Sequence, residues 1–168
     1  MKLLKVLLTL ALFITLGQAK DVSPKEDVVG ALWKKQVSAA KAEVNKITPA
    51  ELMKWNKEDK KFILLDVREK EEVLAGWIEA DNIKKIPRGV LDPVVAKAGA
   101  LKPEQTIVIY CKKGSRGALA GKTLKDLGFK NIYNLEGGIH AWMKAGLPIV
   151  SSLGTFKTVP YELTGCGE

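Results

Sequence analysis

The sequence predicts an α/β fold built on a parallel β-sheet with helices on both faces. Three apolar runs, residues 62–65, 106–110 and 131–135, carry this prediction. Each run is continuous rather than alternating, which is typical of a strand that is covered on both faces. Between the last two runs Ala120, Leu124 and Leu127 recur at helical spacing, and Gly128 follows as the expected helix stop. A strand, a helix and another strand in this order indicate parallel strands joined by a right-handed crossover.

Two further helices are predicted ahead of this sheet. The segment Ser23-Pro24-Lys25-Glu26 has the residue types of a helix start, with Ser at the N-cap and Pro at the first helical position. Apolar residues then recur every three or four positions, which predicts an amphipathic helix: Val29, Trp33, Val37, Ala40 and Val44. The segment Thr48-Pro49-Ala50-Glu51 repeats the start signal and predicts a second helix.

The first 19 residues have the order of a secretory signal peptide. Lys2 and Lys5 precede an apolar run, and Gly17-Gln18-Ala19 ends it with small residues at the positions that a signal peptidase requires. The run is shorter than the roughly 20 residues that span a bilayer. We therefore expect cleavage before Lys20 and a periplasmic or otherwise secreted protein without stable membrane insertion; an uncleaved anchor is the alternative.

Size and charge limit what the rest of the chain can be. The 168 residues are 46% hydrophobic, which supports one domain with its own core. The formal charge of +8 falls to +6 when the two lysines of residues 1–19 are removed. The remaining lysines are mixed with acids, as in residues 54–61, so we expect a solvated face and no nucleic-acid partner. A small anionic substrate remains compatible with the surplus.

The chain has two cysteines, Cys111 and Cys166, and one histidine, His140. Neither their number nor their spacing resembles a metal site, so no metal or other cofactor is expected. Cys166 lies between two glycines near the end of the chain and is interpreted as an idle thiol, with a resolving or disulfide role as the alternative.

Cys111 is the candidate catalytic residue because it opens the loop Cys111-Lys112-Lys113-Gly114-Ser115-Arg116, between a predicted strand and the next helix. Ligands of open α/β sheets bind at the carboxyl ends of strands, where this loop is predicted to lie. The helix start and the three basic residues favour an anion, and Gly114 permits a tight turn. A buried cysteine that only packs is the alternative.

The chemistry expected of Cys111 is sulfur exchange rather than acyl transfer. A cysteine hydrolase needs a histidine to move protons, and His140 is interpreted as a solvated or packing residue on a helix surface. Sulfur exchange needs only a preformed thiolate and a leaving group of low basicity. The missing base therefore favours transfer of sulfane sulfur.

Two sets of residues resemble the motifs of the rhodanese family. The first is Leu65-Asp66-Val67-Arg68 with Glu72, Gly76-Trp77-Ile78 and Asn82-Ile83. The second is the Cys111 loop with Ala118, Leu127-Gly128-Phe129, Leu135, Gly137-Gly138, Ala141-Trp142 and Gly146-Leu147-Pro148. The resemblance covers residues 47–149 and implies a rhodanese-like sulfurtransferase that carries sulfur as a Cys111 persulfide to a thiol or cyanide.

A narrower resemblance, to periplasmic polysulfide-sulfur transferases, rests on residues 34–46, Arg88-Gly89 and residues 118–124. It implies a homodimer that accepts polysulfide, with thiosulfate as the other donor considered. Arg116 would close the loop and, with Lys112, Lys113, Gly114 and Ser115, bind the donor. Arg88 and Arg68 would lie near the pocket, and Asp66 would support Arg68. A surface position for Arg88 and a structural ion pair for Asp66 and Arg68 are the alternatives.

Some residues depart from the family pattern. Trp77 stands where rhodaneses usually have His, and Glu79 where they often have Gly, which puts substrate preference rather than chemistry in doubt. Trp33 and Trp142 are interpreted as core aromatics.

Two other functions compete with the sulfurtransferase. A phosphatase or arsenate reductase would need a Cys-x5-Arg loop, and this loop is one residue shorter. A non-enzymatic persulfide carrier would keep the same loop. The predicted organisation is a signal peptide at 1–19, a helical extension at 20–46, a rhodanese-like domain at 47–149 and a tail at 150–168.

Overall fold

The computed structural model describes residues 28–157. The predicted signal peptide, the helix start at Ser23 and the second cysteine, Cys166, lie outside the described residues. The chain divides after Ala31, and the described part of the first unit, residues 28–31, is the beginning of helix α2. Within the described residues no helix is both long enough and apolar enough to cross a membrane.

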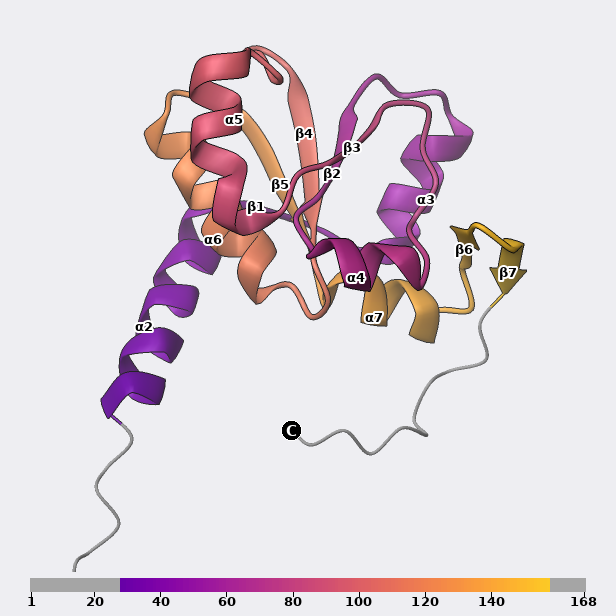
Figure 1. The fold of residues 1–168 in the computed structure, drawn as a ribbon, viewed down its shortest axis with the longest axis horizontal. Helices are drawn as coiled ribbons and strands as arrows, with labels where there is room; N and C mark the ends of the chain where they lie inside the picture. Colours follow the sequence, from indigo (N-terminus) through magenta and orange to yellow (C-terminus); the bar gives the residue numbers. More distant parts are fainter. Residues whose placement is uncertain (1–27, 158–168) are drawn as a thin grey trace, which may run out of the picture. The chain divides into compact units, whose positions relative to one another are not determined.

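Strands and helices alternate along the second unit, residues 32–157 (Figure 1). The strands are β1 (Asn45–Ile47), β2 (Ile63–Asp66), β3 (Ile83–Lys85), β4 (Thr106–Tyr110), β5 (Asn131–Leu135), β6 (Pro148–Ser151) and β7 (Gly154–Lys157). The helices are α2 (Val28–Glu43), α3 (Pro49–Lys57), α4 (Lys70–Leu74), α5 (Leu91–Ala98), α6 (Ser115–Asp126) and α7 (Gly138–Lys144), with a short 3-10 helix η1 (Arg88–Val90).

Five of the strands form one parallel sheet in the order β1-β5-β4-β2-β3. The register sets Asp66 of β2 beside Tyr110 of β4, and Ile109 of β4 beside Asn134 of β5. The predicted fold class, a parallel sheet flanked by helices, is therefore confirmed. The three predicted strands are β2, β4 and β5, and β4 lies at the centre of the sheet.

Helices lie on both faces of the sheet (Figure 1), and an apolar layer of side chains covers each face. Alternate residues of the central strands separate between them, so that Ile107 and Ile109 face the layer with α5 and α6, whereas Val108 and Tyr110 face the layer with α3 and α7. Both faces are buried, which is why these strands read as continuous apolar runs.

Local signals set one end of each of two helices. Thr48 caps α3: its hydroxyl accepts the N–H of Glu51 at 3.2 Å, and the Glu51 carboxylate accepts the N–H of Thr48 at 2.8 Å. Gly128 has a φ of +91° immediately after the C-cap of α6, which is the left-handed conformation expected of a glycine stop. Both predictions from sequence are confirmed.

The amino-terminal helix α2 buries only part of its predicted apolar stripe. Val37, Ala40 and Val44 are buried, but Trp33 remains 45% exposed. The prediction that Trp33 is a core aromatic is therefore wrong, because the described part of the chain leaves this side chain partly uncovered. Trp142, the other predicted core aromatic, is 1% exposed, as expected.

The predicted tail begins with ordered structure. Strands β6 and β7 form an antiparallel hairpin, and Val150 bridges to Trp77 through two backbone hydrogen bonds of 2.8 and 2.9 Å. Strand structure therefore continues to Lys157, beyond residue 149, the predicted end of the domain. The bridge to Trp77 could not be predicted from the local sequence because the two residues lie more than 70 positions apart.

Candidate active site

Cys111 follows the carboxyl end of the central strand β4, and helix α6 begins four residues later at Ser115. The side chain continues the alternation of the strand toward the α6 face and is buried, with the residue 1% exposed. The backbone N–H of Gly114 donates a hydrogen bond to Cys111 Sγ at 3.1 Å. Gly114 adopts a φ of +92°, which turns this amide back toward the sulfur. The loop thus wraps the thiol with main chain.

A second segment, the start of α7, closes the other side of this loop. The N–H groups of Ile139 and His140 donate to the carbonyl oxygens of Cys111 and Lys112 at 2.9 and 3.1 Å. A Cβ atom on Gly138 would lie 2.3 Å from the Cys111 carbonyl oxygen, and Gly138 has a φ of +60°. Glycine is therefore required here, which explains why Gly137-Gly138 accompanies the cysteine loop in the motif.

Arg116 closes the loop through an ion pair rather than standing free. Its two terminal guanidinium nitrogens each donate to a carboxylate oxygen of Glu72 at 2.6 Å, and both side chains are a little under one-third exposed. Glu72 is held in turn at the start of α4, where it accepts the N–H of Glu69 at 3.1 Å. The Arg116 guanidinium holds the pKa of Glu72 below its usual value, and Glu72 raises the pKa of Arg116. The pair ties the Cys111 loop to α4.

The carboxyl ends of β2 and β4 share a buried polar network. Asp66, which is fully buried, accepts hydrogen bonds from Arg68 at 2.6 Å and from the Tyr110 hydroxyl at 2.6 Å. Arg68 is 5% exposed and also donates to the carbonyl oxygens of Glu72 and Gly76. Burial and the neighbouring Asp66 carboxylate raise the pKa of Tyr110, so its hydroxyl stays a donor. These contacts are those of a structural ion pair, the alternative considered for Asp66 and Arg68.

The remaining basic residues lie around the loop at different depths. Lys112 and Lys113 are exposed, and Ser115 is half-buried. Arg88, also half-buried, donates to the Thr123 hydroxyl at 3.0 Å and to Asp92 at 3.3 Å. Burial, together with the charges of Lys112 and Lys113, lowers the pKa of His140, so this side chain is neutral at pH 7.

A hollow of about 590 Å³ brings two of the predicted arginines together. It lies along α2, η1 and α6 and is bordered by Arg88 and Arg116, with apolar walls from Trp33 and Leu119. The full lining is Trp33, Gln36, Ala39, Arg88, Arg116, Leu119, Lys122, Thr123 and Asp126. This hollow is basic and partly apolar, and one of its walls belongs to the cysteine loop.

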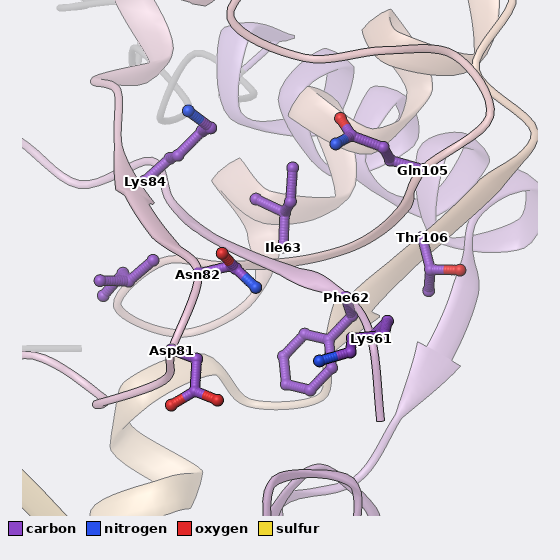
Figure 2. A pocket seen from close by; sticks show the side chains of 9 residues that line it. Lys61, Phe62, Ile63, Asp81, Asn82, Lys84, Gln105 and Thr106 are labelled. Carbon is purple, nitrogen blue, oxygen red and sulfur yellow. The ribbon is translucent and has the colours of Figure 1, made fainter. Parts of the chain in front are cut away.

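A separate hollow of about 470 Å³ lies at the opposite end of the sheet (Figure 2). Its walls include Ile63 and Thr106, the first residues of β2 and β4, and the polar side chains of Asp81, Asn82 and Gln105. Cys111 follows the other end of β4, so this hollow is no part of the cysteine site. Among residues 28–157, no group of three or more His, Cys, Asp or Glu side chains could hold a metal ion.

Comparison with known proteins assigns the family. Residues 48–145 match the family model described as the rhodanese-like domain, which is more than half of the chain. The chain belongs to the rhodanese-like sulfurtransferase family. A sulfurtransferase from Allochromatium vinosum is 31% identical over 111 residues, covering 66% of this chain and 99% of its own length.

Other relatives are similar over part of their length or in structure. The probable adenylyltransferase/sulfurtransferase MoeZ of Mycobacterium tuberculosis is 35% identical over 113 residues, which is 66% of this chain but only 28% of that protein. The polysulfide-sulfur transferase homodimer of Wolinella succinogenes is 42% identical with a TM-score of 0.63, covering 74% of this chain and 90% of that one. A Rhodopseudomonas palustris protein of unknown function, described as a possible tyrosine phosphatase, is 30% identical with a TM-score of 0.62, covering 70% and 92%.

The two departures from the rhodanese pattern contact each other. Trp77 Nε1 donates to the Glu79 carboxylate at 3.0 Å, and the Lys85 ammonium lies 3.3 Å from the Trp77 ring centroid. Trp77 therefore sits between an acid and a base at the carboxyl end of β3, the sheet edge that also carries Cys111. The sequence marked both positions but could not show that they form one cluster.

Reasoning from sequence alone missed three residues that hold the loop in place. Glu72 enters the sequence prediction only as part of a motif, although its spacing from Glu69 matches a capping box and indicates a fixed carboxylate. Tyr110 belongs to a predicted apolar run, although its hydroxyl needs a partner when it is buried. Asn134 likewise lies within a predicted strand, and in the structure its side-chain amide donates to the Gly114 carbonyl at 3.1 Å.

Proposed function

We propose that this protein transfers sulfane sulfur from an anionic donor to a nucleophilic acceptor through a persulfide on Cys111. The observation that carries the proposal is the loop geometry. Sγ accepts the Gly114 N–H at 3.1 Å, and the loop leads into the amino-terminal end of α6. Backbone amides and the helix dipole stabilise negative charge at such a place. They would do so first for the thiolate and then for the outer sulfur of the persulfide.

The proposed cycle has two displacement steps. The Cys111 thiolate attacks the terminal sulfane sulfur of the donor, so that a Cys–S–S⁻ group forms as the donor S–S bond breaks. The electron pair of that bond leaves with the shortened polysulfide, or with sulfite when thiosulfate is the donor. The acceptor then attacks the outer sulfur: cyanide becomes thiocyanate, a thiolate becomes a persulfide, and the Cys111 thiolate is restored. Neither step needs a general base, so the cycle requires no histidine at the loop.

Polysulfide is the donor that we propose, with thiosulfate second. A polysulfide is a chain of sulfur atoms with charged ends, so an entrance that is both basic and apolar fits it. The hollow beside the loop, with Arg88, Arg116, Trp33 and Leu119 in its walls, has that character. The likeness to the Wolinella succinogenes enzyme, which is named a polysulfide-sulfur transferase, supports the same choice.

We further propose that the active form is an exported homodimer. The Wolinella succinogenes relative is described as a homodimer, and Leu32 and Trp33 of α2 leave apolar surface exposed here. Export rests on the sequence of residues 1–19 alone. The mature chain is expected to begin at or near Lys20, which amino-terminal sequencing of the secreted protein would test. Full-length chain in the cytosolic fraction would contradict export.

The test of the persulfide is to load the protein with polysulfide and measure its mass. We expect a gain of one sulfur atom that cyanide removes as thiocyanate, with repeated turnover. Cys111→Ser should lose both the adduct and the turnover, whereas the matched variant Cys166→Ser should keep both. Turnover by Cys111→Ser would show that the nucleophile is misassigned, and loading without turnover would identify a persulfide carrier.

The donor and the phosphatase alternative are separated in the same assay series. We expect kcat/KM to be higher with polysulfide than with thiosulfate at one pH and salt concentration; a tenfold advantage for thiosulfate would identify a thiosulfate sulfurtransferase. Arg116 already donates to Glu72 through two nitrogens, which leaves it poorly placed to hold a phosphoryl group. We therefore expect no Cys111-dependent hydrolysis of p-nitrophenyl phosphate.

A further inference from the structure

Asn134 occupies a position of strand β5 where the fold favours an apolar side chain. Ile132 and Asn134 face the helix α6 side of the sheet, and Ile132 belongs to the apolar layer there. Asn134 is only 5% exposed and lies in register with Ile109 at the centre of the sheet. A polar residue that breaks the pattern of a buried strand points to a role outside packing.

Only one end of the Asn134 side-chain amide forms a hydrogen bond among the described residues. Its Nδ2 group donates to the Gly114 carbonyl oxygen at 3.1 Å. Its Oδ1 atom is buried and has no hydrogen-bond partner among the described residues. An unpaired buried acceptor costs stability, so a smaller or apolar residue here would be at least as favourable for folding. The feature that only asparagine supplies is the donor to Gly114.

Gly114 is the residue whose amide contacts the catalytic sulfur. Its N–H donates to Cys111 Sγ, while its carbonyl oxygen accepts the N–H of Ala118 in the first turn of α6 and the amide of Asn134. The peptide bond between Gly114 and Ser115 is trans and planar. The Ser115 N–H therefore points in the direction opposite to the Gly114 carbonyl, out of the helix and into the loop. Fixing this carbonyl therefore fixes the direction of the Ser115 amide, and it restrains Gly114, whose own N–H donates to Cys111 Sγ.

We propose that Asn134 is a positioning residue for the Cys111 loop: it holds the Gly114 carbonyl so that the Gly114 N–H stays aimed at Cys111 Sγ and the Ser115 N–H keeps its direction into the loop. The proposal rests on the proposed sulfur-transfer function and adds a residue that touches neither donor nor acceptor. Asn134 acts through Gly114, and it favours the step in which negative charge develops on the outer sulfur.

Gly117 provides the means to test the contact from the other side. A Cβ atom on Gly117 would lie 2.3 Å from Asn134 Oδ1, because the helix passes directly over the amide. Gly117→Ala should therefore push the amide away from Gly114. Removing the amide with Asn134→Ala vacates the space that this methyl group needs. The two substitutions are expected to act through one contact and so to be non-additive.

The experiment is a double-mutant cycle on the full chain, with polysulfide as donor and cyanide as acceptor. Asn134→Ala is expected to lower kcat about 3- to 10-fold with KM changed less than about twofold, as for the loss of one neutral hydrogen bond. Gly117→Ala should give a similar loss, and the double variant should be no slower than Asn134→Ala. Asn131→Ala, at the exposed first residue of the same strand, is the matched control and should keep the wild-type rate.

Unfolding in urea separates positioning from general damage. Asn134→Ala and the nearly isosteric Asn134→Leu should unfold within a small shift of the wild-type midpoint, because the unpaired Oδ1 disappears together with the hydrogen bond. Wild-type kcat in both variants would overturn the proposal, as would a double variant whose loss is the product of the single losses. If wild-type protein neither gains a sulfur atom nor turns over, the proposed function fails instead, and the two failures are thereby distinguished.

Discussion

Arg116 joins its loop to helix α4 through Glu72, and this pair changes what is expected of the arginine. An arginine that recognises the donor should lose more activity with a charged donor than with a neutral one when it is removed. An arginine whose guanidinium already holds a carboxylate at 2.6 Å mainly shapes the loop. The structure favours the second role.

Arg116→Ala is therefore expected to lower kcat/KM about tenfold or more for polysulfide and for an uncharged organic trisulfide alike. Glu72→Gln should reproduce much of this loss, although it leaves the arginine in place. Lys54→Gln, which removes an exposed ion pair with Glu58 on α3, is the control and should have no effect. A loss of activity confined to charged donors, with full activity in Glu72→Gln, would indicate instead that Arg116 binds the anionic donor directly.

The ion pair between Arg116 and Glu72 also predicts that the stability of the fold depends on pH. The pKa of Glu72 in the folded protein lies below its usual 4.5, chiefly because Arg116 donates to it. The pair therefore stabilises the fold fully above about pH 5 and loses this effect as the pH falls through the lowered pKa. The difference in unfolding free energy between wild type and Glu72→Gln, about 1 kcal/mol for a partly exposed pair, should be constant above pH 5 and shrink toward pH 3 in urea titrations. A difference that grows on acidification would contradict this assignment.

At the scale of single elements, two neighbouring residues at the end of strand β4 have different roles: one stabilises the core and the next belongs to the candidate site. Its last residue, Tyr110, turns to the α7 layer and bonds Asp66, while Cys111 turns to the opposite layer and enters the loop. The hydroxyl of Tyr110 also accepts the N–H of Ile78 at 3.3 Å. The end of the strand is thus anchored on one face so that the loop on the other face starts from a fixed point.

Tyr110→Phe should reveal this anchoring as a loss of stability rather than of chemistry. Removing the hydroxyl leaves Asp66 with one donor fewer in a buried site, which should lower the unfolding free energy by about 1–3 kcal/mol. Tyr133→Phe, where the ring packs against Trp55 with 5.2 Å between centroids, is the control and should change stability by less than about 0.5 kcal/mol. We expect kcat to remain within a few-fold of wild type. Unchanged stability in Tyr110→Phe would show that the network contributes little.

At the scale of the whole molecule, helix α2 connects the proposed dimer with the proposed donor. Trp33 is exposed and also lines the hollow beside Arg116. Large apolar side chains that remain exposed on a helix are typical of surfaces that another subunit covers. A second copy placed there would narrow the open hollow into an entrance for a chain-like donor.

Trp33→Glu is accordingly expected to convert the dimer into a monomer, halving the molar mass measured by light scattering. It should also reduce kcat/KM for polysulfide more than for thiosulfate. Leu153→Glu, at an equally apolar and 87% exposed position in the hairpin, is the control and should leave the dimer intact. A wild-type protein that is fully active as a monomer at micromolar concentration would remove the dimer from the proposal.

The fold class, the main strands and the family could be predicted from local patterns in the sequence. These depend on local patterns: apolar runs become strands with two buried faces, Thr48 starts α3, and Gly128 ends α6, each through contacts within a few residues. The cysteine loop and its Gly137-Gly138 partner were recognisable for the same reason, since tight turns restrict which residues are allowed. Interactions between residues that are close in sequence can therefore be predicted from the sequence.

Contacts between side chains far apart in the sequence depend on the tertiary structure. Glu72 and Arg116 are 44 residues apart, as are Asp66 and Tyr110, and Asn134 reaches Gly114 across 20 residues. The exposure of Trp33 and the hairpin that joins Val150 to Trp77 depend likewise on what the rest of the fold places beside them. A polar group binds a ligand or a neighbouring residue depending on which hydrogen-bond partners lie beside it. Those partners are brought together only when the sheet assembles.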